Sequence, residues 1–221
     1  MAITRGPKIV RDGLVLYLDA GDRNSYPGSG TTWKDLSGNG NNGTLTNGPT
    51  FDSGNGGSIV FDGSDDYVDI GKSILRNLQS FTVNICFSAN STGALISEGA
   101  SSNRGFQFWI DSTESVLQFG DATNDSYFNS RIPTSFNNIL DVSFSTQNKT
   151  GISYVNSVYQ DSWTNNDLID WTSYTFKIAT RETANSSFVN CKIYMVKVYN
   201  RALSDVEIQQ NFNATKGRFN L

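Results

Sequence analysis

The sequence contains no histidine among its 221 residues. Histidine is the most common general base and a ligand in most catalytic zinc sites, so its absence excludes a Ser-His-Asp triad and most zinc chemistry. The remaining chemistry is that of a carboxylate pair of the glycosidase kind, with one acid and one base or nucleophile. The glutamates are Glu98, Glu114, Glu182 and Glu207. No two of them lie close together on one strand, and we therefore predict that the chain is not an enzyme.

Cysteines and long apolar runs are also scarce. Cys86 and Cys191 are too few for a disulfide framework in a chain of this size, and we expect both to be buried free thiols. No segment approaches the roughly 18 consecutive apolar residues of a membrane span. The first residues lack the apolar core of a signal peptide. We expect synthesis in the cytoplasm, without a signal peptide and without membrane insertion.

Positive charge is in deficit. Lysine and arginine number 17 against 21 aspartates and glutamates, which gives a formal net charge of -4 at pH 7. Because affinity for a phosphate backbone is mostly cationic, nucleic acid is a poor partner for this chain.

What the sequence does contain is a series of short runs rich in β-branched and aromatic residues, separated by polar, glycine-rich segments. In FTVNICF, residues 81–87, the odd-numbered side chains are apolar and share one face, whereas Thr82 and Asn84 point to the other. This pattern favours an all-β fold, a two-sheet antiparallel jelly-roll sandwich. The expected strands are Leu14 to Leu18, Ser58 to Phe61, Tyr67 to Ile70, Phe81 to Phe87, Gly105 to Ile110, Val116 to Phe119, Ile139 to Phe144, Ile152 to Tyr159, Thr175 to Ala179 and Val189 to Tyr199.

One segment near the C-terminus has a helical pattern. Ser204 followed by Glu207 forms a capping box, and Lys216 with Gly217 supplies a stop. We predict a short helix at about 204–214 that packs on the edge of the sandwich. No linker divides the chain, so we expect an N-terminal arm over residues 1–12 and a single domain over 13–221.

The stretch DLSGNGNNG, residues 35–43, is unusually rich in glycine and in oxygen-bearing side chains. One interpretation is a pair of tight turns, because glycine and asparagine tolerate positive φ and short polar side chains bond to their own backbone. The other is a cation site, since Asp35, Ser37 and Asn39 match the first ligand positions of an EF-hand loop. The match ends at Thr46, because an EF-hand loop has a bidentate glutamate at the corresponding position.

A second acidic stretch could complete such a site. In FDGSDDYVDI, residues 61–70, a turn and the following strand are crowded with Asp62, Asp65, Asp66 and Asp69. Oxygen-rich loops at one rim of a sandwich suit Ca²⁺ better than zinc. The alternative is that these carboxylates shape a turn and face solvent. The candidate metal ligands are Asp35, Ser37, Asn39, Asp65 and Asp66, and the candidate cofactor is Ca²⁺.

Several segments together carry a family resemblance. They are GLVLYLDAGDRNSYPGSGTTWKDLSGNGNNGTLTNGPTF, IVFDGSDDYVDI, SFTVNICF, ISYVNSVY and KIYMVKVYNRALSDVEIQQNFNATKGRF. In order, they resemble the laminin-G-like group of concanavalin A-type jelly rolls, in the single-domain form found among structural proteins of tailed bacteriophages, particularly marine cyanobacterial ones. The resemblance covers almost the whole chain.

This resemblance implies a domain used for binding or assembly. The first expectation is a non-catalytic virion structural protein at the virion surface, a capsid decoration or fibre-associated domain that contacts other virion proteins and adheres to host polysaccharide. Arg5, Lys8 and Arg11 contrast with the acidic body and form a candidate docking arm, although an ordinary frayed terminus is the alternative. An oligomer is compatible with this role.

Two alternatives remain open. The first is a calcium-dependent lectin, in which Trp163, Trp171 and Tyr127 supply a flat aromatic platform for a sugar. Trp109, in the run FQFW, fits core packing better. The second alternative is a glycan-cleaving enzyme that uses carboxylates such as Asp111 and Glu114.

Overall fold

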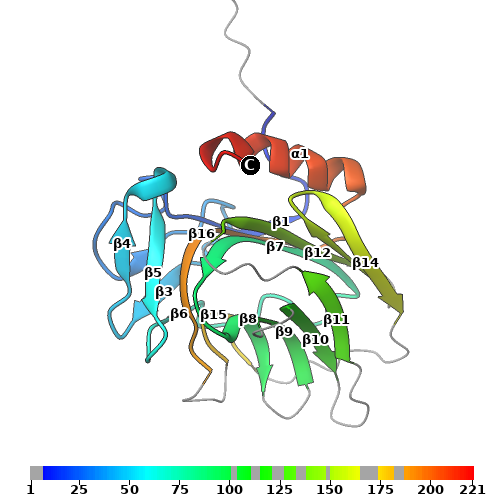
Figure 1. Ribbon diagram of the computed structural model, residues 1–221, viewed down its shortest axis with the longest axis horizontal. Helices are drawn as coiled ribbons and strands as arrows, with labels where there is room; N and C mark the ends of the chain where they lie inside the picture. The colour runs from blue at the N-terminus through cyan, green and yellow to red at the C-terminus, as the bar shows by residue number, and fades with distance from the viewer. Residues whose placement is uncertain are drawn as a thin grey trace, which may run out of the picture.

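The computed structural model describes residues 7–100, 104–110, 115–120, 127–132, 138–147, 150–164, 174–181 and 187–221. Over these residues the chain forms two facing antiparallel β-sheets and one α-helix, which confirms the predicted jelly-roll sandwich (Figure 1). Sheet A runs in the spatial order β14 (Val158–Thr164), β13 (Thr150–Val155), β12 (Leu140–Gln147), β7 (Ser80–Ala89), β16 (Asn190–Tyr199), β5 (Ser58–Asp62) and β4 (Thr50–Asp52), with β1 (Leu14–Asp19) also paired to β16. Sheet B runs in the order β11 (Tyr127–Ile132), β10 (Ser115–Gly120), β9 (Arg104–Ile110), β8 (Gly93–Ala100), β15 (Lys177–Ile178), β6 (Tyr67–Asp69), β3 (Gly43–Thr46) and β2 (Thr32–Trp33).

The main core lies between the two sheets. It contains the odd-numbered apolar residues of β7, as the alternation predicts, together with apolar residues of β8 and β9. Phenylalanine rings cross the gap between the sheets: Phe81 and Phe106 lie edge to face with their centroids 5.8 Å apart, and Phe87 and Phe108 do so at 6.0 Å. The predicted core face of β7 is therefore confirmed.

The opposite face of β7 is also buried, which its polar composition does not predict. Thr82 and Asn84 are at most 1% exposed, and Asp141 and Ser143 of the neighbouring β12 are nearly as inaccessible. The C-terminal helix covers this outer face of sheet A (Figure 1). Sheet A is thus covered on both sides along its centre.

Strand β16 occupies the centre of sheet A. It pairs with β7 along one side, and with β5 and then β1 along the other. Its register shifts between Ile193 and Met195, so the strand carries a bulge. The sequence left open whether this doubly apolar strand is central or bulged, and both features are present.

The helix α1 (Asp205–Thr215) begins at the predicted capping box. Glu207 N donates to Ser204 Oγ at 3.4 Å, and Ser204 N donates to Glu207 Oε2 at 3.0 Å. A 3₁₀ turn (Lys216–Arg218) follows the helix. The predicted position on the sandwich edge is wrong, because α1 lies across the face of sheet A, where Ile208 packs into the same apolar cluster as strand residues.

Two smaller expectations concern cysteine and membrane spans. Cys86 and Cys191 are buried free thiols, as predicted, and burial raises the pKa of both.

Among the described residues, no helix is long and apolar enough to cross a membrane, and α1 is both too short and too polar to do so.

Candidate binding cleft

A row of polar side chains crosses the outer face of sheet A beneath α1. Tyr17 of β1 is opposite Lys197 of β16, Lys197 is opposite Asn84 of β7, and Asn84 is opposite Ser143 of β12. Tyr154 of β13 ends the row opposite Ser143. Because residues in register across a sheet share one face, these side chains all point toward the helix.

The middle of this row is a sealed hydrogen-bond network. The Lys197 ammonium donates to Asn84 Oδ1 at 2.8 Å, and Asn84 Nδ2 donates to Asp141 Oδ1 at 2.8 Å. Burial lowers the pKa of Lys197 and raises the pKa of Asp141. Lys197 is 0% exposed and Asp141 4% exposed, so neither group can meet a solute. The network is therefore an internal support for the outer face.

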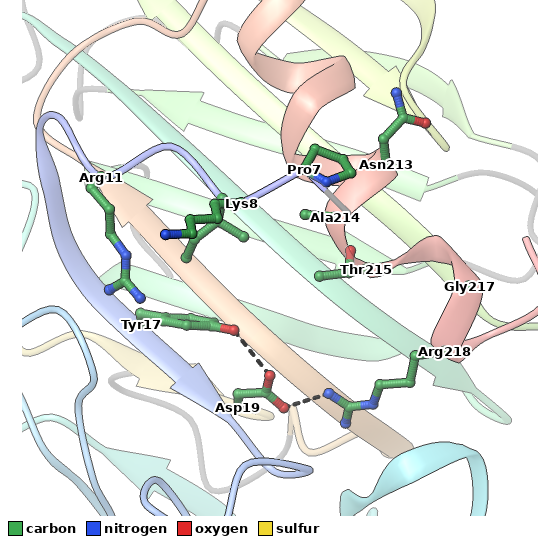
Figure 2. Close-up of a pocket in the computed structure, with 11 residues that line it drawn as sticks. Pro7, Lys8, Arg11, Tyr17, Asp19, Asn213, Ala214, Thr215, Gly217 and Arg218 are labelled. Atoms are coloured by element: carbon green, nitrogen blue, oxygen red, sulfur yellow. Dashed lines mark hydrogen bonds and ion pairs between the residues drawn. The ribbon is translucent and has the colours of Figure 1, made fainter. Parts of the chain in front are cut away.

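The β1 end of the row opens into a cleft of about 510 Å³ (Figure 2). Its walls come from the N-terminal segment (residues 7–11), from β1, and from residues within 213–218 at the C-terminal end of α1. A smaller cavity of about 390 Å³ lies at the other end of the helix, between Ile152, Tyr154 and Asp205. The larger cleft collects more charged side chains and is the candidate functional site.

The floor of the cleft is a chain of three side chains. The Tyr17 hydroxyl donates to Asp19 Oδ2 at 3.0 Å, and Arg218 Nη1 donates to Asp19 Oδ1 at 2.5 Å (Figure 2). Burial, and then the Asp19 carboxylate, raise the pKa of Tyr17, which therefore remains a neutral donor. Arg218 also donates to the carbonyls of Asn55 and Gly57, so the floor is fixed from several directions.

The N-terminal segment forms the wall above this floor. Val10 N donates to Asn211 Oδ1 at 2.8 Å, and the Tyr199 hydroxyl donates to the Val10 carbonyl at 3.1 Å. The side chains of Lys8 and Arg11 extend from this segment over Tyr17 (Figure 2). The last part of the predicted arm is thus packed onto the domain, with its two cations beside the cleft. Arg5 lies outside the described residues.

The loop at residues 35–43 is organised around one carboxylate. Asp35 is 6% exposed, and its Oδ1 accepts from the backbone N–H groups of Tyr17 and Ser37. Its Oδ2 accepts from Ser37 Oγ at 2.7 Å and from Asn41 N at 3.0 Å. Asn39 Nδ2 donates to Ser37 Oγ and to the Leu14 carbonyl. These contacts show the turn chemistry that the sequence offered as one of its two interpretations.

The second acidic stretch lies elsewhere. Carboxylate oxygens of Asp62, Asp65 and Asp66 lie within 4.8 Å of one another, between β5 and β6. Thr46 pairs with Tyr67, so this turn flanks the end of β3, whereas the loop at 35–43 precedes its start. The structure does not bring the two halves of the predicted calcium site together. Three clustered oxygens fit the ligand preference of Ca²⁺, and an ion at this turn stays a prediction.

The predicted aromatic platform falls largely outside what the structure describes. Trp171 lies outside the described residues, and of Tyr127 in β11 and Trp163 in β14 only the backbone is described. Trp109 is partly buried in β9, with the Arg181 guanidinium 4.6 Å from its ring centroid. Asp111 and Glu114 also lie outside the described residues.

Sequence reasoning did not find Tyr17, Asp19 or Arg218. Tyr17 and Asp19 have the same parity in the first strand, which places both on the outer face of sheet A. That signal indicates a shared face but not a partner 199 residues later in the chain.

Comparisons with known proteins agree with this architecture. The family model described as the concanavalin A-like lectin/glucanases superfamily matches residues 62–209, which is more than half of the chain. A search of curated protein sequences gave no match.

Solved structures share the fold at low sequence identity. Domain 4 of AbnA, an extracellular arabinanase from Geobacillus stearothermophilus solved in complex with arabinotriose, is 16% identical with a TM-score of 0.71, and the match covers 90% of this chain and 98% of that one. The binding domain of Paraclostridial Mosquitocidal Protein 1 is 18% identical with a TM-score of 0.72, covering 92% and 52%. A botulinum neurotoxin type C structure, described for a toxin whose cell entry depends on interaction with two ganglioside molecules, is 16% identical with a TM-score of 0.73, covering 93% and 52%. The chain therefore spans about half the length of these toxin structures.

Proposed function

Because this chain belongs to the concanavalin A-like lectin/glucanases superfamily, we propose that it is a non-catalytic carbohydrate-binding module whose sugar site is the cleft beside β1. The observation that carries the proposal is the floor of the cleft, where Tyr17 and Asp19 are held in one geometry by Arg218. Sugar sites combine an apolar or aromatic surface with a few fixed polar groups, and this floor supplies both. Domain 4 of AbnA, which has a similar fold, was solved in complex with arabinotriose, and this supports a saccharide as the class of ligand.

The charge inventory of the cleft supports binding without cleavage. Asp19 is the one carboxylate among its described lining residues, and it already accepts from Tyr17 and Arg218. Glycosidases of the common kind place two carboxyl groups about 5–10 Å apart across the scissile bond. The cleft offers one such group, and it is in an ion pair with Arg218.

A steric block tests the location of the site. Ala214 lines the cleft from the last turn of α1, so Ala214→Trp fills it without replacing a floor residue (Figure 2). Val206 is 73% exposed on the same helix, away from the cleft, and Val206→Trp is the matched control. We expect a glycan array to show binding for wild type and V206W, and its loss for A214W with unchanged circular dichroism. Equal binding by A214W places the sugar elsewhere, and no binding by wild type contradicts the proposal.

We further propose that the module is carried on a virion surface, as a capsid decoration or fibre-associated domain made in the host cytoplasm. The resemblance to structural proteins of tailed bacteriophages supports this role, and many copies on one particle make even millimolar glycan contacts useful through avidity. Deleting residues 2–6 removes Arg5 and leaves the packing of Val10 intact. We expect lower occupancy on particles after this deletion, and unchanged occupancy contradicts a docking role for the arm.

A further inference from the structure

We infer that the cleft selects an anionic saccharide, one that carries a carboxylate or sulfate group held between Lys8 and Arg11 while its hydroxyls meet Tyr17 and Asp19. This inference rests on the proposed glycan-binding function and adds the class of sugar. It follows from the charge balance of the cleft, the availability of its cations and the acceptors on its floor.

The charge of the cleft is opposite to that of the protein. The chain has a formal net charge of -4, yet the described lining carries Lys8, Arg11 and Arg218 against Asp19 alone. Arg218 and Asp19 neutralise each other in their ion pair. Lys8 and Arg11 remain as uncompensated positive charge in the lining of the cleft. They give the cleft a positive potential that attracts an anion, although the protein as a whole is acidic.

Both of these cations have N–H groups that remain available to a ligand. Among the described residues, no hydrogen bond or ion pair holds the Lys8 ammonium, which carries three N–H groups. Arg11 donates from Nη1 to the Leu36 carbonyl at 3.2 Å, and its guanidinium carbon lies 5.7 Å from the centroid of the Tyr17 ring. A guanidinium has five N–H donors in a planar fork, so most of them stay available to a carboxylate or sulfate.

The backbone that carries the cations is fixed in advance. Gln210 Nε2 donates to the Lys8 carbonyl at 2.7 Å, and Val10 is bonded to Asn211 and Tyr199. Both cations extend from this segment on the side of Tyr17 (Figure 2). A segment that is already ordered loses less conformational entropy when the ligand arrives, which strengthens the contact.

The floor explains why the ligand is a sugar and not a bare anion. The Tyr17 hydroxyl donates a hydrogen bond to Asp19 Oδ2, so its oxygen can still accept one, and Asp19 Oδ2 accepts only from Tyr17 among the described residues. The side chain of Asn213 also lines the cleft. Acceptors need hydroxyl donors, which a saccharide has and a sulfate ion lacks.

Calorimetry on the full chain with matched ligands tests the inference. The probes are a trisaccharide of galacturonate, the same trisaccharide after reduction of its carboxyl groups to neutral galactose, a sulfated galactose trisaccharide, and inorganic sulfate. We expect the two anionic trisaccharides to bind at least tenfold more tightly than the neutral one, a difference of about 1.4 kcal/mol. The two anionic arms show whether carboxylate or sulfate is preferred. Binding of inorganic sulfate as tight as that of the sulfated sugar overturns the inference, because the floor would then contribute nothing.

Charge-removing variants identify the residues. Lys8→Gln and Arg11→Gln should each weaken binding of the anionic trisaccharides about tenfold, and should weaken binding of the neutral trisaccharide by a clearly smaller factor, because both side chains line the cleft. Lys34→Gln and Arg23→Gln are the matched controls, since both side chains are exposed and neither lines the cleft. Raising NaCl from about 0.1 M to about 1 M shortens the screening length from roughly 10 Å to roughly 3 Å and should abolish the preference for the anionic probes.

The outcomes separate this inference from the function on which it rests. Equal affinity for neutral and anionic trisaccharides, lost in A214W, sustains the glycan module and overturns the anionic specificity. The absence of binding to every saccharide overturns both. Loss of anionic binding in K34Q or R23Q as great as in K8Q assigns the effect to overall charge and also overturns the inference.

Discussion

Lys197 and Asn84 lie opposite each other in neighbouring strands, and the Lys197 ammonium donates to Asn84 Oδ1 at 2.8 Å with no exposed surface. The Nδ2 group of Asn84 donates hydrogen bonds to Asp141 Oδ1 and to Ser143 Oγ. A lysine and an aspartate that do not touch are therefore joined through one asparagine beneath α1. Because their hydrogen bonds are satisfied, these polar strand residues can form a buried surface on which the helix packs and beside which the cleft lies.

Replacement of Lys197 should strongly destabilise the fold. Lys197→Met leaves the Asp141 carboxylate buried without its compensating charge, which costs about 3–5 kcal/mol. We expect a lower urea midpoint with an unchanged slope. Lys192→Met is the control on the same strand, because its ion pair with Asp52 is exposed and should contribute less than about 1 kcal/mol. Adding Asp141→Asn to K197M should recover part of the loss, and equal stability of K197M and K192M contradicts the network's role.

The ion pair that anchors the start of α1 should make stability depend on acid pH. Arg201 holds the pKa of Glu207 down to about 2, from an ordinary value of 4.5. Because the folded state favours the ionised form, this contribution is complete above pH 4.5 and is lost as the pH falls toward 2. Glu207→Gln keeps a capping side chain but not the charge. In urea titrations between pH 7 and pH 2.5 the midpoint of E207Q should fall less steeply than that of wild type, and parallel curves contradict the assignment.

Much of the fold could be predicted from local sequence because its signals are local. Alternation in residues 81–87 reveals a core face, and Ser204 with Glu207 reveals the start of a helix. The burial of Thr82 and Asn84 could not be predicted, since a polar parity ordinarily indicates solvent. These side chains are satisfied by partners far along the chain: Asn84 bonds to Lys197 across 113 positions.

The candidate site was less predictable for a related reason. Its two walls, residues 7–11 and 213–218, are separated by almost the whole chain, and neither contains a recognisable motif. The loop at residues 35–43 does contain a recognisable motif. However, both carboxylate oxygens of Asp35 already accept hydrogen bonds from backbone N–H groups and from the Ser37 hydroxyl. The conspicuous motif organises a turn, whereas inconspicuous residues build the cleft.

Glu98 should control the loop between β6 and β7. It is 1% exposed, and its carboxylate accepts from Ser73 Oγ and from the backbone N–H groups of Ile74 and Leu75. Glu98→Ala removes the acceptor of all three donors, and the loss of the buried Leu75 N–H partner alone costs about 1–3 kcal/mol. Arg76 is exposed in this loop, so limited trypsin digestion should cut E98A there much faster than wild type. Glu98→Gln, which keeps acceptor capacity, should be intermediate, and identical digestion of E98A and wild type contradicts the anchoring role.

Calcium should stabilise the turn at residues 62–66 and leave the loop at 35–43 unaffected. The oxygens of Asp62, Asp65 and Asp66 already lie within 4.8 Å of one another, and burial raises the pKa of Asp66, so a cation would relieve both repulsion and desolvation. At a concentration tenfold above its Kd, Ca²⁺ should add about 1.4 kcal/mol and raise Tm by about 3–6 °C. Asp65→Asn should abolish the Tm shift, measured by calorimetry with Mg²⁺ as the comparison ion. Asp35→Asn should lower the starting Tm but retain the shift, because each Asp35 oxygen is already shared by two donors. A shift lost in D35N and kept in D65N would move the ion to the loop at 35–43. No shift at about 10 mM Ca²⁺, which is roughly tenfold above the weakest Kd of extracellular sites, would show that neither stretch binds it.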